Sequence, residues 1–396
     1  MPWKETCAMK ERMRLIEDYD GGEESLAVLC RIYGISRTTA YKWLNLYDQG
    51  GAEALADRSR EPHSHPNATP EAIEERIVEA RAEHPTWGPR KLLAWLARHD
   101  RSEPWPATST IGAILKRNGM VARRRRKRRT PPYTDPFVGV NGPNETWCAD
   151  FKGWFRTGDG RRCDPLTISD AHSRYVLRCQ ALETTRSPRV KAIFEAAFRQ
   201  YGLPRAIRTD NGAPFASIAV RGLSPLSVWW IKLGIVPERI EPGRPEQNGR
   251  HERMHLTLKQ ETAAPPKSSR RAQQRAFDRF VEQFNEDRPH EALGQRPPAS
   301  VYHPSTRSYP ERVAEVEYPE SMQVRRVQMY GHIKWRCRRL FISETLRGES
   351  VGLEQIDDRR WKVYFAHLEL GTFEDGDRLQ LKPIQPAPRR SRRGKS

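Results

Sequence analysis

The chain has 396 residues, which is too long for one typical domain, so we expect two to four domains. Its formal net charge of +19 favours a polyanionic partner, either nucleic acid or an acidic membrane surface. The chain contains no run of about 18 apolar residues, which is the length needed to span a bilayer. Its N-terminal residues lack the apolar core of a signal peptide. The sequence therefore argues against a membrane-spanning protein, and we expect a cytoplasmic one.

The cysteines give no sign of a metal site. They form no Cys-x-x-Cys pair, and no histidine pair stands beside them at zinc-finger spacing. We expect small, mostly buried thiols in a reducing compartment, without structural zinc. The six residues are Cys7, Cys30, Cys148, Cys163, Cys179 and Cys337.

A helix-turn-helix pattern lies between residues 26 and 47. Residues 26–33 are predicted to form one helix, and Gly34 can adopt the left-handed conformation that ends it. Ser36 is a good N-cap for a second helix over residues 37–47. This layout is typical of DNA-binding helix-turn-helix modules, although an ordinary pair of antiparallel helices shares most of it. The exposed residues that we predict to contact DNA are Arg37, Thr38, Thr39, Tyr41 and Lys42.

A second, similar module follows after a polar turn. Thr69-Pro70-Glu71 caps one predicted helix, with Pro70 at its first helical position, residues 92–96 mark another, and a third begins near Thr108. We predict a second helix-turn-helix with a longer turn, so that two modules in series could bind a longer DNA site.

An unbroken basic run, residues 123–129, separates these modules from the rest of the chain. Such a run is typical of a solvated linker. Its charge density also predicts contacts with DNA phosphates, because each neutralised phosphate releases counterions. The residues we predict to make these contacts are Arg124, Arg125, Arg126 and Lys127.

From about residue 140 the pattern changes to alternating strands and helices. Strands are predicted over residues 146–155, 166–169, 174–182 and 206–209, and the first helix between them over residues 187–201. This order indicates a mixed sheet flanked by helices. Later, Ile333, Trp335 and Cys337 alternate with basic residues, which predicts a small antiparallel β domain with one basic face.

Three acidic residues lie on three different predicted elements. Asp150 is in a strand, Asp210 ends another strand, and Glu252 lies on a helix. They can meet only if the two strands are adjacent and the helix packs across their ends. Three ionised carboxylates repel each other and need a cation or a proton. Oxygen ligands select Mg²⁺ or Mn²⁺, and two such ions can activate a nucleophile and stabilise the leaving oxygen of a phosphoryl transfer. Lys259 shares a helix face with Glu252, and we predict that it binds a DNA phosphate.

A group of motifs carries a resemblance to a known family. The motif residues are Asp150, Asp210-Asn211-Gly212, Pro245-x-x-Asn248-Gly249-x-x-Glu252, Lys259 and the segment 285–293. Together they resemble the Asp-Asp-Glu core of retroviral integrases and of related bacterial insertion-sequence transposases. The order of helix-turn-helix, core and small β domain is also similar to that of the bacterial transposases.

The resemblance implies a ribonuclease-H-like fold. It also implies that Asp150, Asp210 and Glu252 are catalytic metal ligands, with two Mg²⁺ or Mn²⁺ ions as cofactors. It further implies cleavage of double-stranded DNA at transposon ends, attack of the freed 3′-hydroxyl on target DNA, and a homo-oligomer working at the bacterial nucleoid. Two features depart from the retroviral pattern. The zinc domain is absent, and the Asp210–Glu252 spacing is longer, which we attribute to a loop insertion at residues 221–225.

The expected fold class is therefore multidomain, with all-α helix-turn-helix modules, a central α/β core and a small all-β domain. The expected segments are a helix-turn-helix domain (1–60), a second such domain (66–122), a basic linker (123–139), the catalytic core (140–302), the β domain (318–384) and a disordered basic tail (385–396). Two alternatives stay open: a transcriptional regulator with an inactive core, and a nuclease without strand transfer. A membrane-surface protein fits least, because no lipid-binding amphipathic helix accompanies the charge.

Overall fold

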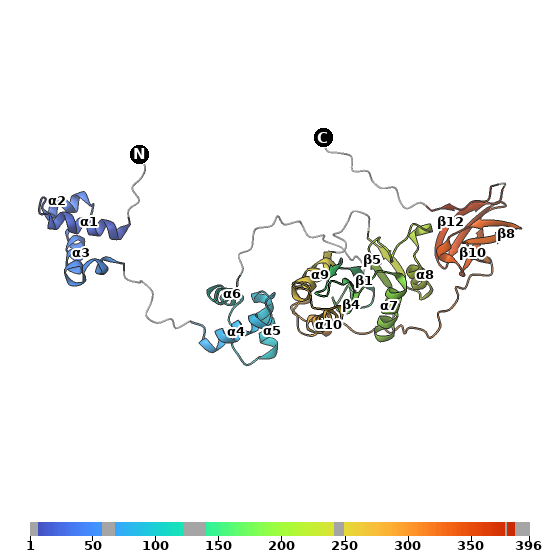
Figure 1. Cartoon of the computed structure of the whole chain (residues 1–396), viewed down its shortest axis with the longest axis horizontal. Helices are drawn as coiled ribbons and strands as arrows, with labels where there is room; N and C mark the ends of the chain where they lie inside the picture. The colour runs from blue at the N-terminus through green and yellow to red at the C-terminus, as the bar shows by residue number, and fades with distance from the viewer. Residues whose placement is uncertain (1–6, 58–67, 122–139, 241–248, 377, 385–396) are drawn as a thin grey trace, which may run out of the picture. The chain divides into compact units, whose positions relative to one another are not determined.

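The computed structural model describes residues 7–57, 68–121, 140–240, 249–376 and 378–384 (Figure 1). The chain divides into two compact units, Met1–Thr69 and Pro70–Ser396. Within the described ranges, no helix has the length and apolarity needed to cross a membrane. The basic run and the tail lie outside these ranges, as do the predicted DNA contacts Arg124, Arg125, Arg126 and Lys127.

The first unit is helical, and its turn follows the sequence pattern. Its elements are α1 (Ala8–Asp20), α2 (Leu26–Ile32), α3 (Arg37–Gly50) and the short helix η1 (Gly51–Leu55). Gly34 has a φ of +65°, where an L side chain is strained, so glycine suits this turn. The Ser36 hydroxyl accepts a hydrogen bond from the Thr39 amide at 3.1 Å and caps α3. Leu15, Leu29 and Ala40 form the small core between the helices.

The second unit begins with three helices, as the sequence predicts. They are α4 (Glu71–Glu83), α5 (Pro89–His99) and α6 (Thr108–Arg117). The expected position of Pro70 was wrong by one residue, because Pro70 is the N-cap of α4 rather than its first residue. One cluster from all three helices forms the core, including Ile77, Leu92 and Ile111, which are fully buried.

A mixed sheet forms the centre of the second unit. Its strands are β1 (Thr146–Phe151), β2 (Phe155–Arg156), β3 (Arg162–Asp170), β4 (Val176–Leu182), β5 (Ala206–Thr209) and β6 (Val236–Arg239). The main order is β4-β3-β1-β5-β6, with β2 also pairing with β3. β3 is antiparallel to β1 and β4, whereas β1, β5 and β6 are parallel. The single strand predicted over residues 146–155 was wrong, because Gly153, with a φ of +87°, lies in the turn between β1 and β2.

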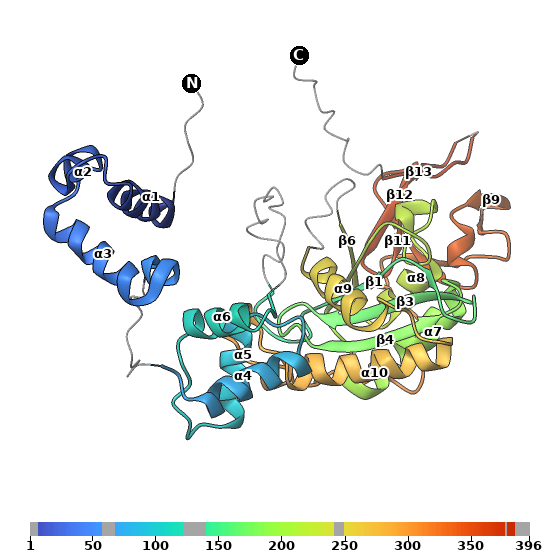
Figure 2. The same cartoon turned by 60° about the vertical axis from the view of Figure 1, so that its left-hand side comes forward.

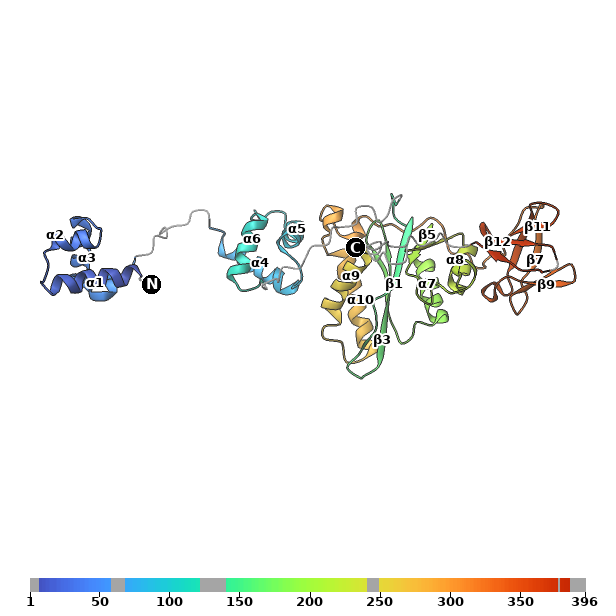
Figure 3. The same cartoon turned by 90° about the horizontal axis from the view of Figure 1, so that it is seen from above.

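Helices cover both faces of this sheet (Figure 3). The helices are α7 (Ser187–Tyr201), α8 (Pro225–Lys232), α9 (Gly249–Thr262) and α10 (Arg270–Glu286). On one face, Phe194, Phe198 and Trp230 of α7 and α8 pack on the sheet. On the other face, α9 and α10 bury a separate cluster that includes Leu258 and Phe277; Figure 2 shows α10 running along β4. The expected sheet flanked by helices is confirmed.

The C-terminal part is a small antiparallel β domain. Its strands are β7 (Gln323–Arg326), β8 (His332–Trp335), β9 (Arg338–Phe341), β10 (Ser350–Gln355), β11 (Arg360–Phe365), β12 (Leu368–Glu374) and β13 (Lys382–Pro383). The predicted place of Cys337 in a strand was wrong. Cys337 is exposed and has a φ of +62° in the turn between β8 and β9, so the alternation ends at Trp335.

The β domain packs against α8 of the core. Leu223, Val228 and Ile231 belong to the same buried cluster as the β-domain side chains. Lys232 forms a salt bridge with Glu349 at 2.9 Å, and both side chains are mostly buried. The segment 221–225, which we predict to be an insertion, therefore leads directly into this contact surface.

Candidate active site

Asp150 lies near the C-terminal end of β1. Asp150 pairs with Thr167 of β3 in the strand register, and its side chain is 18% exposed. The preceding residues of β1 are buried between the two helical layers. The strand therefore presents this carboxylate at the point where it leaves the core.

Asp210 comes directly after β5, at the same level of the sheet. Because β1 and β5 are parallel and Ala149 pairs with Thr209, Asp150 and Asp210 are the next residues on two adjacent strands. Neighbouring strands lie about 4.8 Å apart. The Asp210 carboxylate accepts a hydrogen bond from the Gly212 amide at 3.1 Å, which shapes the turn after the strand. The strand register thus places two of the three predicted acidic residues at neighbouring backbone positions.

Helix α9 is anchored to the sheet beside Asp150 by a buried hydroxyl. Thr167 Oγ1 donates to the Asp150 backbone carbonyl at 3.2 Å. The same oxygen lies 2.6 Å from Nε2 of both His251 and His255. Since a threonine hydroxyl has one proton, both imidazoles then donate their Nε2–H to it. The Ser169 hydroxyl, 3.1 Å from His251 Nδ1, completes the network by donating to that nitrogen.

Both histidines are neutral in this network. Burial lowers the pKa of His251 to about 3. Burial, followed by the neighbouring His251 and Lys152, also lowers the pKa of His255. His255 Nδ1 faces the Asp150 carboxylate at 3.9 Å. The two side chains are almost completely buried, so they hold the helix in place and do not face solvent.

Glu252 is one turn before His255 on α9 and is exposed. The structure packs its helix against β3, with His255 3.9 Å from the Asp150 carboxylate, but does not close a compact triad. Among the described residues, no group of three or more His, Cys, Asp or Glu side chains is positioned to hold a metal ion. Lys259, two turns after Glu252, is also exposed.

The predicted DNA-contacting residues of α3 divide into two groups. Arg37, Thr38, Tyr41 and Lys42 are exposed. Thr39 is only partly exposed, and its hydroxyl lies 2.9 Å from the Ser36 hydroxyl at the helix cap. Four of these five residues are therefore exposed, and their contacts with DNA stay a prediction.

Sequence reasoning missed Thr167. It is fully buried in β3, and a threonine in an apolar strand ordinarily has a structural role only. A histidine pair four residues apart on a helix was the available clue, because buried imidazoles need hydrogen-bond partners.

Four family models match the chain. Residues 140–245 and 233–298 match two integrase core domain models. Residues 11–63 match a helix-turn-helix domain, and residues 39–115 match a homeodomain-like domain.

Similar proteins come from bacterial insertion elements. The chain is 29% identical to an uncharacterized 39.2 kDa protein of insertion element IS476 from Xanthomonas euvesicatoria, over 62% of this chain and 69% of that protein. It is 27% identical to an uncharacterized 31.7 kDa protein of IS407 from Burkholderia multivorans, over 68% and 87%. It is 28% identical to the transposase InsD of IS2 elements from Escherichia coli, over 56% and 75%.

Solved structures with a similar region include viral integrases. The HTLV-2 integrase catalytic core domain in complex with magnesium has a TM-score of 0.33 and 17% identity, over 41% of this chain and 99% of that chain. A chain of the simian T-cell lymphotropic virus intasome in complex with the PP2A regulatory subunit B56 gamma has a TM-score of 0.36 and 15% identity, over 74% of this chain and 97% of that chain.

The fold and the family models define a DNA-binding protein with a ribonuclease-H-like core. This follows from the helix-turn-helix modules, the mixed sheet with helices on both faces, and the match to integrase core models. The integrase core matches and the similarity to proteins of bacterial insertion elements support an insertion-sequence transposase of the integrase superfamily. These similarities support a role in DNA transposition or integration in general.

Proposed function

We propose that the protein cleaves DNA at the ends of its element and joins the freed 3′-hydroxyl to target DNA, using Asp150, Asp210 and Glu252. The parallel register of β1 and β5 is the observation that carries this proposal, because it sets the two aspartates side by side. The proposal adds Glu252 from α9, which the hydrogen bonds of His251 and His255 to Thr167 hold against β3, beside Asp150.

The donor set fits a hard divalent cation. All three proposed ligands are carboxylates, and oxygen donors of this kind select Mg²⁺ or Mn²⁺. Two such ions, when bound, would activate the attacking oxygen and stabilise the leaving oxygen. Since the three carboxylates do not form one cluster among the described residues, the proposal requires the exposed Glu252 side chain to approach the aspartates.

The protein's other residues have positioning and binding roles in this proposal. Thr167, His251 and His255 set the position of α9 relative to β1. Lys259, on the exposed side of α9, binds a phosphate of the DNA end. The residues that read the ends are Arg37, Thr38, Thr39, Tyr41 and Lys42 of α3, with phosphate contacts from Arg124, Arg125, Arg126 and Lys127 in the basic run.

Joining two ends to one target requires both active sites in one complex, so we also propose that the protein works as a homo-oligomer on DNA of the bacterial nucleoid. The domain bounds predicted from the sequence belong to the same proposal, with the catalytic core at residues 140–302.

The test is strand transfer by the full chain in Mg²⁺ or Mn²⁺, with a duplex that carries the element's terminal repeat and a plasmid target. We expect joined products with the wild type and none with Glu252→Gln. Glu282→Gln is the matched control, because Glu282 is an exposed glutamate on the neighbouring helix α10. Cleavage without joining would instead favour a nuclease, and specific binding with neither activity would favour a regulator.

A further inference from the structure

The module formed by α4, α5 and α6 contacts the helices that cover the mixed sheet. Module and sheet belong to the same compact unit. In the turn after α4, the Thr86 hydroxyl donates to the Glu261 carboxylate of α9 at 2.5 Å. From α5, Arg98 donates to the Asp287 carbonyl at the end of α10 at 2.9 Å. The module is therefore bonded to two helices of the core and is not joined to it by the chain alone.

The surfaces that meet carry opposite charges. The α5 residue Arg90 pairs with Glu291 at 3.1 Å, although both side chains are exposed and such a pair contributes little to stability. The next residue, Lys91, is half-buried. Burial, followed by the cations Arg288 and Arg253, lowers the pKa of Lys91 to about 8. The basic side of α5 therefore lies against the core, where its charges meet carboxylates of the same chain.

Arg288, in the loop after α10, connects three elements. Its guanidinium donates to Glu261 of α9 at 2.7 Å. The same group lies 5.9 Å from the ring of Trp87 in the module and 5.8 Å from the ring of Phe284 in α10, both within cation–π range. Arg288 is only 7% exposed, and a buried charge is stable only when it is paired. One buried side chain thus joins the module, α9 and α10.

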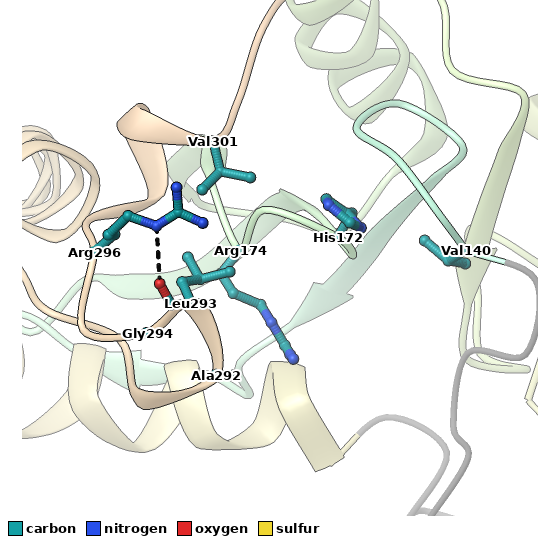
Figure 4. A pocket seen from close by; sticks show the side chains of 8 residues that line it. All are labelled: Val140, His172, Arg174, Ala292, Leu293, Gly294, Arg296 and Val301. Carbon is teal, nitrogen blue, oxygen red and sulfur yellow. Dashed lines mark hydrogen bonds between the residues drawn. The ribbon is translucent and has the colours of Figure 1, made fainter.

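The loop that carries Arg288 is held by hydrogen bonds of its own. The Arg288 amide donates to the Gln283 carbonyl at 2.9 Å, and the His290 amide donates to the Arg296 carbonyl at 3.2 Å. Further along, Leu293 and Arg296 line a cavity of about 510 Å³ (Figure 4), and Arg296 Nε donates to the Leu293 carbonyl at 3.1 Å. These bonds give the loop a defined shape, so Arg288 has a fixed base from which to hold its partners.

Helix α9 is therefore held at both of its ends. Glu252 and Glu261 are nine residues apart on this helix, or about 14 Å along its axis. Near Glu252, the helix is bonded to Thr167 of β3. In the last turn, Gln273 of α10 donates to the Thr262 carbonyl at 3.0 Å, and Glu261 meets the module. Contacts at one end would let the helix swing, whereas contacts at both ends fix its direction, and the module supplies part of the second contact.

We propose that Arg288 is a positioning residue, which joins the α4–α6 module to α9 so that the module and Glu252 move as one body. This gives a role to the segment 285–293, whose residues are not among the proposed metal ligands. The module is then part of the catalytic unit and not a freely tethered DNA reader. The inference rests on the proposed function, because that function requires Glu252 to approach the aspartates, and the position of the module sets the direction of its helix.

The first experiment is native-state hydrogen exchange of the full chain without DNA or metal, read by mass spectrometry on peptides of the module (71–99) and of α9 (255–262). With Arg288→Gln, we expect exchange in both regions to increase by about tenfold or more, because removing one partner of a buried ion pair is strongly destabilising. Arg275→Gln, which changes an exposed arginine of α10, is the control and should exchange like the wild type. Unchanged exchange in either region of the Arg288→Gln protein would overturn the proposal.

A charge exchange covers the case in which Arg288→Gln does not fold. Arg288→Glu and Glu261→Arg should each increase exchange in the module and in α9, because each places two like charges together. The double variant restores an ion pair across the same contact, so its protection should return toward the wild-type level. A double variant that folds by circular dichroism but is no better protected than the single variants would show that this pair does not join the two parts.

The second experiment separates positioning from DNA recognition. Binding to the element's ends is measured by fluorescence anisotropy, and cleavage of the same duplex is measured over a range of Mg²⁺ concentrations. We expect Arg288→Lys to bind the ends like the wild type but to need a several-fold higher Mg²⁺ concentration for half-maximal cleavage, since Glu252 is less well directed. Weaker end binding with an unchanged Mg²⁺ requirement, or faster cleavage than the wild type, would overturn the positioning role.

The two experiments also distinguish this inference from the proposed function. If the wild type does not cleave its ends, the proposed function fails, and hydrogen exchange still decides whether Arg288 joins the module to α9. If the wild type cleaves and Arg288→Lys has the wild-type Mg²⁺ requirement, the positioning role fails and the proposed function stands.

Discussion

The hydroxyl of Thr167 offers a direct test of how α9 is held beside Asp150. Thr167→Val keeps the shape of the side chain but removes the acceptor of two imidazole N–H groups. Leaving a buried donor unsatisfied costs about 1–3 kcal/mol each. We therefore expect the docking of α9 to weaken by about 2–6 kcal/mol.

The assay is native-state hydrogen exchange of the full chain, read by mass spectrometry on peptides that cover residues 249–262. A loss of 2 kcal/mol increases local exchange by about 30-fold, since about 1.4 kcal/mol is a factor of ten. Peptides of α10 serve as an internal reference. We also expect DNA cleavage to decrease together with the protection of α9.

The matched control is Thr257→Val on the same helix. Thr257 bonds only locally among the described residues, with its hydroxyl 3.2 Å from the Arg253 carbonyl. If Thr167→Val and Thr257→Val gave the same exchange in α9, the proposed anchoring of this helix through Thr167 would be refuted.

Three further predictions concern the site, the helix-turn-helix and pH. Asp210→Asn should abolish DNA cleavage in a gel assay while leaving binding to the ends intact. The control Asp278→Asn, which changes an exposed residue of α10, should cleave DNA normally. Cleavage by Asp210→Asn would contradict the assignment of Asp210 as a catalytic residue. Arg37→Ala should weaken specific end binding by about 1–3 kcal/mol, whereas Arg31→Ala on α2 should not, and equal affinities in a salt titration would remove α3 from DNA recognition. Burial, then neighbouring cations, lowers the folded pKa of His290 to about 3 from the ordinary value near 6.5, so the unfolded state takes up the proton first. The His290 contribution to stability should be complete above about pH 6.5 and fall by up to about 1.4 kcal/mol per unit between pH 6.5 and 3, in addition to the losses from the buried His251 and His255, whose pKa values are also lowered. Urea unfolding should show this loss, and a wild-type pH dependence in His290→Gln would exclude His290 as its source.

Several features could be predicted from the sequence because their causes are local. Ser36 caps α3, and Gly34 has the positive φ that its turn requires. Helix α7 has the predicted bounds, since an apolar stripe at helical spacing needs only one face to bury. The insertion-sequence transposase family could also be recognised, because the motifs around Asp150 and Asp210 are short and contiguous.

Other features follow from contacts between distant segments. Nothing near Asp150 in the sequence specifies that β5 lies beside β1 in the register that aligns it with Asp210. The hydrogen bonds from His251 and His255 to Thr167, more than eighty residues away, could not be predicted from the sequence either.

Local patterns also failed where a turn interrupted them. The alternation that ends at Trp335 continues in the sequence to Cys337, but the chain reverses there with positive φ at Arg336 and Cys337. Sequence alone thus determined the family, the order of the elements and the residue types available for chemistry. Tertiary structure decided which of those residues meet, because strand register and helix docking depend on the packing of the whole core.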